Sequence, residues 1–384
     1  MINNVVVTRK LPHILIAGFL LLLFLMSNRF GFITLLMIWS IITLLFVSIN
    51  KYADKTGLLI ILFSVVYSIC GILTGSMVTI TEILPTALPM FSFYVFGKLV
   101  GSEFSNKQII LFLQLILFAY SLEIFLTIVL DIIQTGSIFN SSREFYLLGD
   151  ESRNLTATLV GLRADCGIIG IPLALSMFRF SKAYGFSFFL LGLLSILTTI
   201  FLLNRTAIVI LIVISFLNLY YWNKRNIKKI VLSLLLLLLA ALVLDDSNIV
   251  NAELFQAYSD RNANLATGGD RTMRWIVALA NIFRYPFGWN DNLGYVHNMW
   301  LDIAKVSGII PLAILLLLTL ISFKDLYKLV RVNNDVVAIT LVSLSLAIFL
   351  SCMVEPIYGG IHLFLYALVW GIVRSYIYKH AIYH

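Results

Sequence analysis

The stretch QIILFLQLILFAYSLEIFLTIVLDII, from Gln108 to Ile133, decides the fold class of this chain. An apolar run of roughly 18 residues or more predicts a helix that is long enough to cross a lipid bilayer. Because lipid offers the backbone no hydrogen-bond partner, and because the run does not alternate with a period of two, we expect a helix and not a barrel strand. Glu123, in the middle of the run, is either functional or bonded to a neighbouring helix.

Runs of the same kind fill the rest of the chain. Of its 384 residues, 60% are hydrophobic and only 12% are charged, which is too little polar surface for a soluble domain. We therefore predict an all-α, polytopic integral membrane protein with about 12 transmembrane helices, in a single helical domain over residues 1–384. The helices are expected near residues 11–27, 30–49, 57–76, 82–100, 108–133, 161–180, 185–203, 205–222, 230–246, 301–323, 336–354 and 361–379.

The first of these segments has the look of a signal peptide. Arg9 and Lys10 precede its apolar run. No small-residue cleavage site follows it, however, and a second apolar run begins at Phe30. We therefore expect a retained first helix.

The connecting loops predict the orientation in the membrane. Loops that share one side carry mostly lysine, and the positive-inside rule assigns this side to the cytoplasm. Both termini then lie in the cytoplasm, as an even number of helices requires. The basic residues on this side are Arg9, Lys10, Lys51, Lys55, Lys98, Lys107, Arg179, Lys182, Lys224, Arg225, Lys228, Lys229, Lys324, Lys328, Arg331, Arg374 and Lys379.

The basic residues expected outside are almost all arginine. Arginine has a planar fork of donors that can grip two phosphate oxygens together, whereas lysine is a point charge. The pattern favours an anionic, phosphate-bearing ligand, although pairing with nearby acids such as Glu144 and Asp270 also explains it. The outer residues are Arg29, Arg143, Arg153, Arg163, Arg205, Arg261, Arg271, Arg274 and Arg284, with Lys305 at a helix start.

Two of the outer loops are long, at residues 134–161 and 245–300. Loops of this length in a compact protein are usually functional or flexible. Within the second loop, residues 271–284 predict an amphipathic helix, because Trp275, Leu279 and Ile282 recur at helical spacing. Such a helix would lie along the membrane surface or cover a cavity.

Several short motifs in the second half of the chain occur in a characteristic order. Together they resemble the O-antigen polymerase and O-antigen ligase superfamily, whose members are lipid-linked oligosaccharide transferases of bacterial envelopes. Two matches are looser, since Asn204 stands where the family carries serine and Leu173 stands where asparagine is common. The motifs are Arg163-x-x-x-Gly167-x-x-Gly170-x-Pro172, Asn204-Arg205-Thr206-Ala207, Arg271-x-x-Arg274-Trp275, Pro286-Phe287-Gly288-Trp289, His297-Asn298-x-x-Leu301 and Gly308-Ile309-Ile310.

The resemblance implies a fold, a location and partners. It implies a GT-C-like helical bundle in the bacterial inner membrane, with the active site facing the periplasm. The donor and the acceptor would be glycans on polyprenyl (undecaprenyl) diphosphate, and a chain-length regulator protein would be a partner. No nucleic acid or cofactor is expected. No metal is expected either, because arginine can stabilise the charge that builds on the diphosphate without one.

The resemblance and the chemistry together nominate the site residues. Histidine titrates nearest to neutral pH and suits a general base, and His297 is the only histidine in either long outer loop. A helix-start histidine that only hydrogen-bonds locally is the alternative reading. The expected catalytic residues are His297, Arg205, Arg271 and Arg274, and the expected substrate-binding residues are Arg163, Asn298, Asp302 and Arg284.

Three functions remain open from the sequence. The first is a polymerase that joins repeat units at the outer face of the membrane, and the second is the sister ligase that moves finished polymer to a lipid A core. The third is a flippase or transporter, which the single asymmetric outer loop system disfavours. A metal-dependent enzyme would instead use outer carboxylates, for which Asp245 and Asp246 form the only adjacent acidic pair near a helix end on the outer side.

Overall fold

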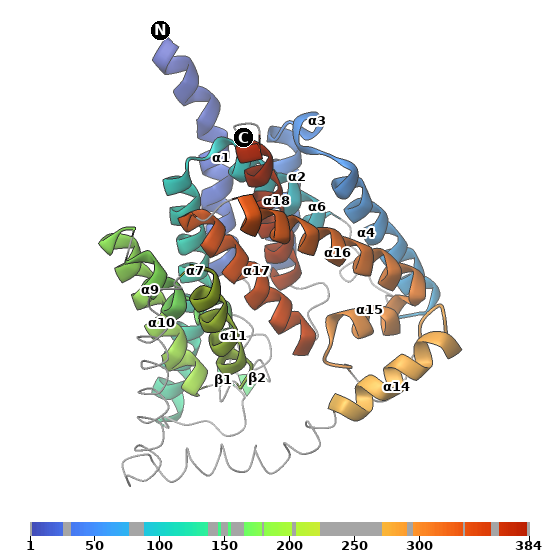
Figure 1. Ribbon diagram of the computed structural model, residues 1–384. Coiled ribbons are helices and arrows are strands. Elements are labelled where there is room, and N and C mark those ends of the chain that lie inside the picture. Colours follow the sequence, from blue (N-terminus) through green and yellow to red (C-terminus); the bar gives the residue numbers. More distant parts are fainter. Residues whose placement is uncertain are drawn as a thin grey trace. The chain divides into compact units, whose positions relative to one another are not determined.

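The computed structural model is almost entirely helical (Figure 1). It describes residues 2–25, 32–76, 88–136, 145–146, 153–154, 165–178, 180–201, 205–222, 271–289, 295–332, 335–354 and 361–381. The elements are α1 (Ile2–Leu25), α2 (Phe32–Phe46), α3 (Ile49–Tyr52), α4 (Lys55–Leu73), α6 (Pro89–Glu103), α7 (Asn106–Thr135), β1 (Phe145–Tyr146), β2 (Arg153–Asn154), α9 (Gly170–Met177), α10 (Lys182–Phe201), α11 (Arg205–Trp222), α14 (Arg271–Arg284), α15 (Met299–Ser307), α16 (Ile309–Val332), α17 (Val336–Val354) and α18 (Ile361–Ala381). Within these residues, the strands are limited to the two-residue antiparallel pair β1–β2.

Five described helices are long and apolar enough to cross a membrane. The helical fold is confirmed and is compatible with a membrane protein, while the total of about twelve spans remains a prediction. The predicted helix 230–246 lies outside the described residues. The five spans are Lys55–Leu73, Asn106–Thr135, Lys182–Thr199, Ile309–Arg331 and Val336–Val354.

The predicted helix 301–323 is interrupted. Gly308 separates α15 from α16 with a φ of +85°, a left-handed conformation that glycine adopts easily. A Cβ atom at Gly308 would lie 2.3 Å from the carbonyl oxygen of Pro286. The break therefore comes from a tertiary contact, which the hydrophobic pattern along the chain does not encode.

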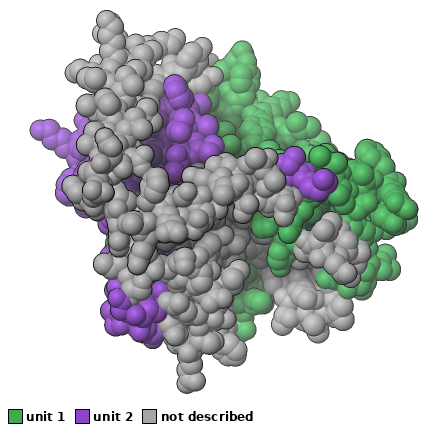
Figure 2. Space-filling model, turned by 90° about the horizontal axis from the view of Figure 1, so that it is seen from below, with its two compact units in different colours: residues 1–123, 274–384 green, residues 124–273 purple. Residues whose placement is uncertain are grey.

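The chain divides into two compact units, which Figure 2 distinguishes by colour. Unit 1 comprises residues 1–123 and 274–384, and unit 2 comprises residues 124–273. In unit 2, α9 packs closely on α10, because a Cβ at Gly170 would lie 2.5 Å from the carbonyl oxygen of Phe188. The Ser176 hydroxyl donates to Asn218 Oδ1 at 3.0 Å and joins α9 to α11.

Unit 1 is built around the close crossing of α6 and α18. A Cβ at Gly97 would lie 2.1 Å from the carbonyl oxygen of Leu368, and one at Gly371 would lie 2.2 Å from that of Tyr94. Small residues let two helix backbones approach in this way. Both helices are buried along most of their described length.

The helices of unit 1 have two distinct ends. We call one the α3 end, where α4 begins and α16 and α18 finish, and the other the α15 end (Figure 1). At the α15 end, the Thr74 hydroxyl that follows α4 donates to the carbonyl oxygen of Val306 in α15 at 2.7 Å. The predicted outer loop segment and the predicted inner lysine loops thus lie at opposite ends of this unit.

Candidate functional site

The amphipathic helix that the sequence predicted at residues 271–284 is present as α14. Its two faces differ, since Ala278 and Ile282 are buried while Phe283 is 81% exposed. Arg271 opens the helix and Arg284 closes it. The Arg284 guanidinium lies over the ring of Tyr285, 5.5 Å from its centroid.

The turn after α14 is fixed against α15 and α16. The N–H of Ile309 donates to the carbonyl oxygen of Pro286 at 2.8 Å, and the N–H of Trp289 donates to that of Lys305 at 2.9 Å. Gly288 has a φ of +107°, and a Cβ there would lie 2.9 Å from the Lys305 oxygen. The turn therefore folds α14 back toward α15.

Two side chains of α14 hold the segment that precedes α15. Arg274 Nη1 donates to the carbonyl oxygen of Tyr295 at 2.8 Å, and Trp275 Nε1 donates to that of Val296 at 3.0 Å. These bonds bring the Arg274 guanidinium to the segment that carries His297. The predicted arginine–aromatic pair and the predicted histidine thus belong to one local structure.

His297 has an unusual backbone. Its φ of +60° is the only positive value among the described residues other than glycine. A non-glycine residue in this region costs free energy, and such strain clusters at functional sites. The backbone on both sides is held by Asp302, whose Oδ1 accepts the N–H of Val296 at 2.7 Å and whose Oδ2 accepts the N–H of Asn298 at 3.2 Å.

Asp302 is only 2% exposed. Burial, the largest effect, raises the pKa of its carboxyl group, while the N–H groups of Val296 and Asn298 and the charges of His297 and Lys305 act in the opposite direction. Burial prevails, so the pKa lies above its ordinary value. The sequence analysis named Asp302 as a substrate-binding residue; the bonds described here run from its carboxylate to the backbone around His297.

Asn298 is the N-cap of α15. Its Oδ1 accepts the N–H of Leu301 at 3.3 Å, which satisfies one of the backbone donors at the start of the helix. Its Nδ2 donates to the carbonyl oxygen of Met353 at the end of α17, at 3.1 Å. Both ends of the amide thus bond to the protein, and a role for Asn298 in substrate binding remains a prediction.

The structure describes less of the other predicted site residues. Arg163, Asp245 and Asp246 lie outside the described residues. Arg205 begins α11 in unit 2, and its side chain lies outside the described part. The roles assigned to Arg163 and Arg205 therefore remain predictions from the sequence.

A network of partly buried charges at the α3 end was not predicted. The Asp54 carboxylate pairs with Lys98 Nζ at 2.8 Å and with Arg374 Nε at 3.1 Å, and Arg374 Nη1 lies 3.4 Å from Asp325. Burial raises the pKa of Asp54, but the hydrogen bonds from Lys98 and Gly57 and the two cations outweigh it, so the pKa is lowered. The charges of the two carboxylates and the two cations balance here, which suits a structural role for the network.

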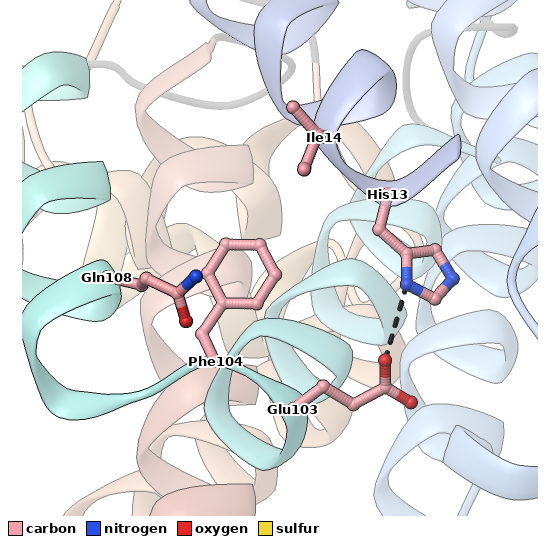
Figure 3. A pocket seen from close by; sticks show the side chains of 5 residues that line it. All are labelled: His13, Ile14, Glu103, Phe104 and Gln108. Carbon is pink, nitrogen blue, oxygen red and sulfur yellow. Dashed lines mark ion pairs between the residues drawn. The ribbon is translucent and has the colours of Figure 1, made fainter. Parts of the chain in front are cut away.

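A small pocket also lies at the α3 end (Figure 3). It has a volume of about 70 Å³ and is lined by His13, Ile14, Glu103, Phe104 and Gln108. Figure 3 shows the His13 ring facing Glu103. His13 Nδ1 lies 3.3 Å from the Glu103 carboxylate. The sequence placed His13 inside a helix and gave no sign of this pair.

The Glu103 carboxylate also binds residues of α3. It lies 2.8 Å from Lys51 Nζ and accepts the hydroxyl of Tyr52. Burial raises the pKa of Glu103, but the hydrogen bonds from Lys51 and Tyr52 outweigh it and the pKa is lowered. The carboxylate is thus engaged by three neighbours, which makes this pocket a poorer catalytic candidate than the region around His297.

The fold is helical, and five of the described helices are long and apolar enough to cross a membrane, which suggests a membrane-embedded protein. Comparison with known proteins matches it to no family model and to no curated protein. Within the described residues, no three His, Cys, Asp or Glu side chains form a group that would hold a metal ion.

Proposed function

We propose that this protein is a glycosyltransferase that polymerises polyprenyl-diphosphate-linked repeat units into O-antigen or capsular polysaccharide at the outer face of the membrane. The observation that carries the proposal is the geometry at His297. A strained backbone is held there by a buried carboxylate, in a segment that an arginine of α14 also contacts. Strain of this kind persists where the surroundings enforce it, as they do at many active sites.

The proposed step is a direct displacement. The oxygen of an acceptor sugar hydroxyl attacks the anomeric carbon of the donor glycan, and the bond from that carbon to the diphosphate oxygen breaks. His297 accepts the hydroxyl proton, and polyprenyl diphosphate leaves with the bonding electron pair. One displacement inverts the configuration at the anomeric carbon.

The arginines would stabilise the leaving group. Negative charge builds on the diphosphate as the bond breaks, and preorganised cationic donors stabilise that charge most in the transition state. Arg274 is the best supported of these, because its helix is tied to the His297 segment by two side-chain bonds. Arg271 lies one turn earlier in the same helix, and Arg205 is proposed from the sequence alone.

The experiment is deletion of the gene followed by gel analysis of the surface polysaccharide. A single repeat unit on the lipid A core would support a polymerase, whereas polymer left on the lipid carrier would indicate the ligase. Complementation with wild type should restore long chains, and His297→Gln should not. The matched control is His13→Gln, which removes a histidine at the α3 end and should restore long chains. Unchanged polysaccharide in the deletion strain would overturn the proposal.

A further inference from the structure

The outward surface of α14 carries large apolar side chains at helical spacing. Ile276 is 57% exposed, Leu279 is 53% exposed and Phe283 is 81% exposed. Phe287, in the turn that follows, is 67% exposed. We call these four residues the α14 apolar face.

The α14 apolar face lies at the level where two membrane spans end. The span in α16 begins at Ile309, which is bonded to Pro286 beside Phe287. The span in α4 ends at Leu73, and the adjoining Thr74 bonds to Val306 just before α16. The ends of both candidate spans therefore lie beside the turn that carries Phe287.

Exposed apolar side chains continue from this turn onto both spans. Ile310 in the first turn of α16 is 50% exposed, and Leu73 at the end of α4 is 78% exposed. Further along α16, Leu320 is 67% exposed. Exposed apolar residues on a candidate membrane span suit contact with lipid, and the α14 apolar face continues a surface of the same chemistry.

The charge of α14 also suits contact with phospholipid. The helix contains Arg271, Arg274 and Arg284 and no acidic residue. Phospholipid headgroups carry phosphate, and helices with one apolar face and basic residues elsewhere lie in the plane of the interface. A second copy of this chain would instead bring the same three cations to the contact.

We infer that α14 is an interfacial helix, whose apolar face inserts into the boundary between the headgroups and the acyl chains of the outer leaflet. The inference does not depend on the proposed function, because it concerns the membrane and not the substrate. It places Arg274 at the depth of phospholipid phosphates. A lipid-borne diphosphate would reach the same depth.

The test is nitroxide accessibility in vesicles of phosphatidylethanolamine and phosphatidylglycerol. Single cysteines are introduced as Ile276→Cys and Phe283→Cys, in a protein whose three native cysteines are replaced by alanine. Leu320→Cys serves as the lipid-facing reference and Ser105→Cys, at an exposed position outside the candidate spans, as the water-facing one.

Labels at 276 and 283 should relax strongly with oxygen and weakly with a water-soluble nickel chelate, as the label at 320 does. Strong relaxation by the nickel chelate, as at 105, would overturn the inference because the face would then be in water. Weak relaxation by both reagents would also overturn it, since a protein surface would then cover the face. The labels are read without substrate, so failure here is distinct from failure of the proposed function.

Discussion

Replacing Asp302 by asparagine tests the idea that a buried carboxylate positions His297. Asp302→Asn keeps the size of the side chain and one carbonyl acceptor, but its amide nitrogen cannot accept the second N–H. In the native protein, the two carboxylate oxygens accept from Val296 and Asn298 at 2.7 and 3.2 Å. The variant must therefore leave one of these N–H groups without its acceptor.

The expected fall in kcat follows from these contacts. A hydrogen bond to a charged group contributes about 1.5–3 kcal/mol, and part of this is offset because a neutral amide costs less to bury than a carboxylate. The variant should therefore lose a net stabilisation of this segment of about 1–2 kcal/mol. This loss is similar in size to the cost of about 1–3 kcal/mol for a strained backbone such as that of His297. The segment should therefore relax, and kcat should fall about tenfold, since 1.36 kcal/mol corresponds to a factor of ten.

The assay is turnover of lipid-linked donor by purified protein in vesicles, with donor binding measured separately. Asp302→Asn should lower kcat while the donor Kd stays near the wild-type value. The matched control is Asp335→Asn, because Asp335 Oδ1 also accepts a backbone N–H, from Ala338 at 2.8 Å, but at the α3 end. Wild-type kcat in Asp302→Asn, or an equal fall in the control, would refute the positioning role.

Four further outcomes are expected. The unfolding free energy of His297→Gly, measured with denaturant, should be about 1 kcal/mol higher than that of His297→Ala, because glycine adopts a positive φ without strain. Equal unfolding free energies would argue against strain. Arg274→Lys should lose most turnover, because a point charge cannot replace the fork, while the control Arg331→Lys should retain it. The pKa of Asp54 is lowered in the folded protein, so its ion pairs contribute stability that is fully present above the ordinary pKa of 3.8 and is lost as the pH falls through the lowered value. The difference in melting temperature between wild type and Asp54→Asn should therefore shrink over that pH range. A difference that stays constant with pH would contradict this expectation. Turnover should survive EDTA, and loss that added divalent metal restores would favour a metal-dependent enzyme.

Much of the local structure could be predicted from the hydrophobic pattern. The bounds of α11, α14 and α17 match residues 205–222, 271–284 and 336–354 as predicted. Periodicity and length set these helices, and lipid enforces helical hydrogen bonding where they cross the membrane. The break at Gly308 could not be predicted, because it depends on a contact with Pro286 more than twenty residues earlier.

The candidate site was predictable in its residue types but not in its bonding. The resemblance and the chemistry drew attention to Asp302 and Asn298, yet the contacts to the backbone of Val296 and to Met353 depend on a left-handed turn and on a distant helix. The ion pairs of Asp54 show the same limit. Their partners lie far along the chain, and the lysine and arginine pattern predicts only a shared side of the membrane.

The most direct test of the central claim is a comparison of turnover and donor binding in purified His297→Gln. Glutamine keeps hydrogen bonding but cannot act as a base, and general-base catalysis contributes roughly 10²–10⁴-fold in rate. We expect a loss of about that size with donor binding retained, while turnover of His13→Gln stays near wild type. Normal turnover in His297→Gln would make His297 structural, and loss of donor binding together with turnover would make it a donor ligand; either result contradicts its role as the base.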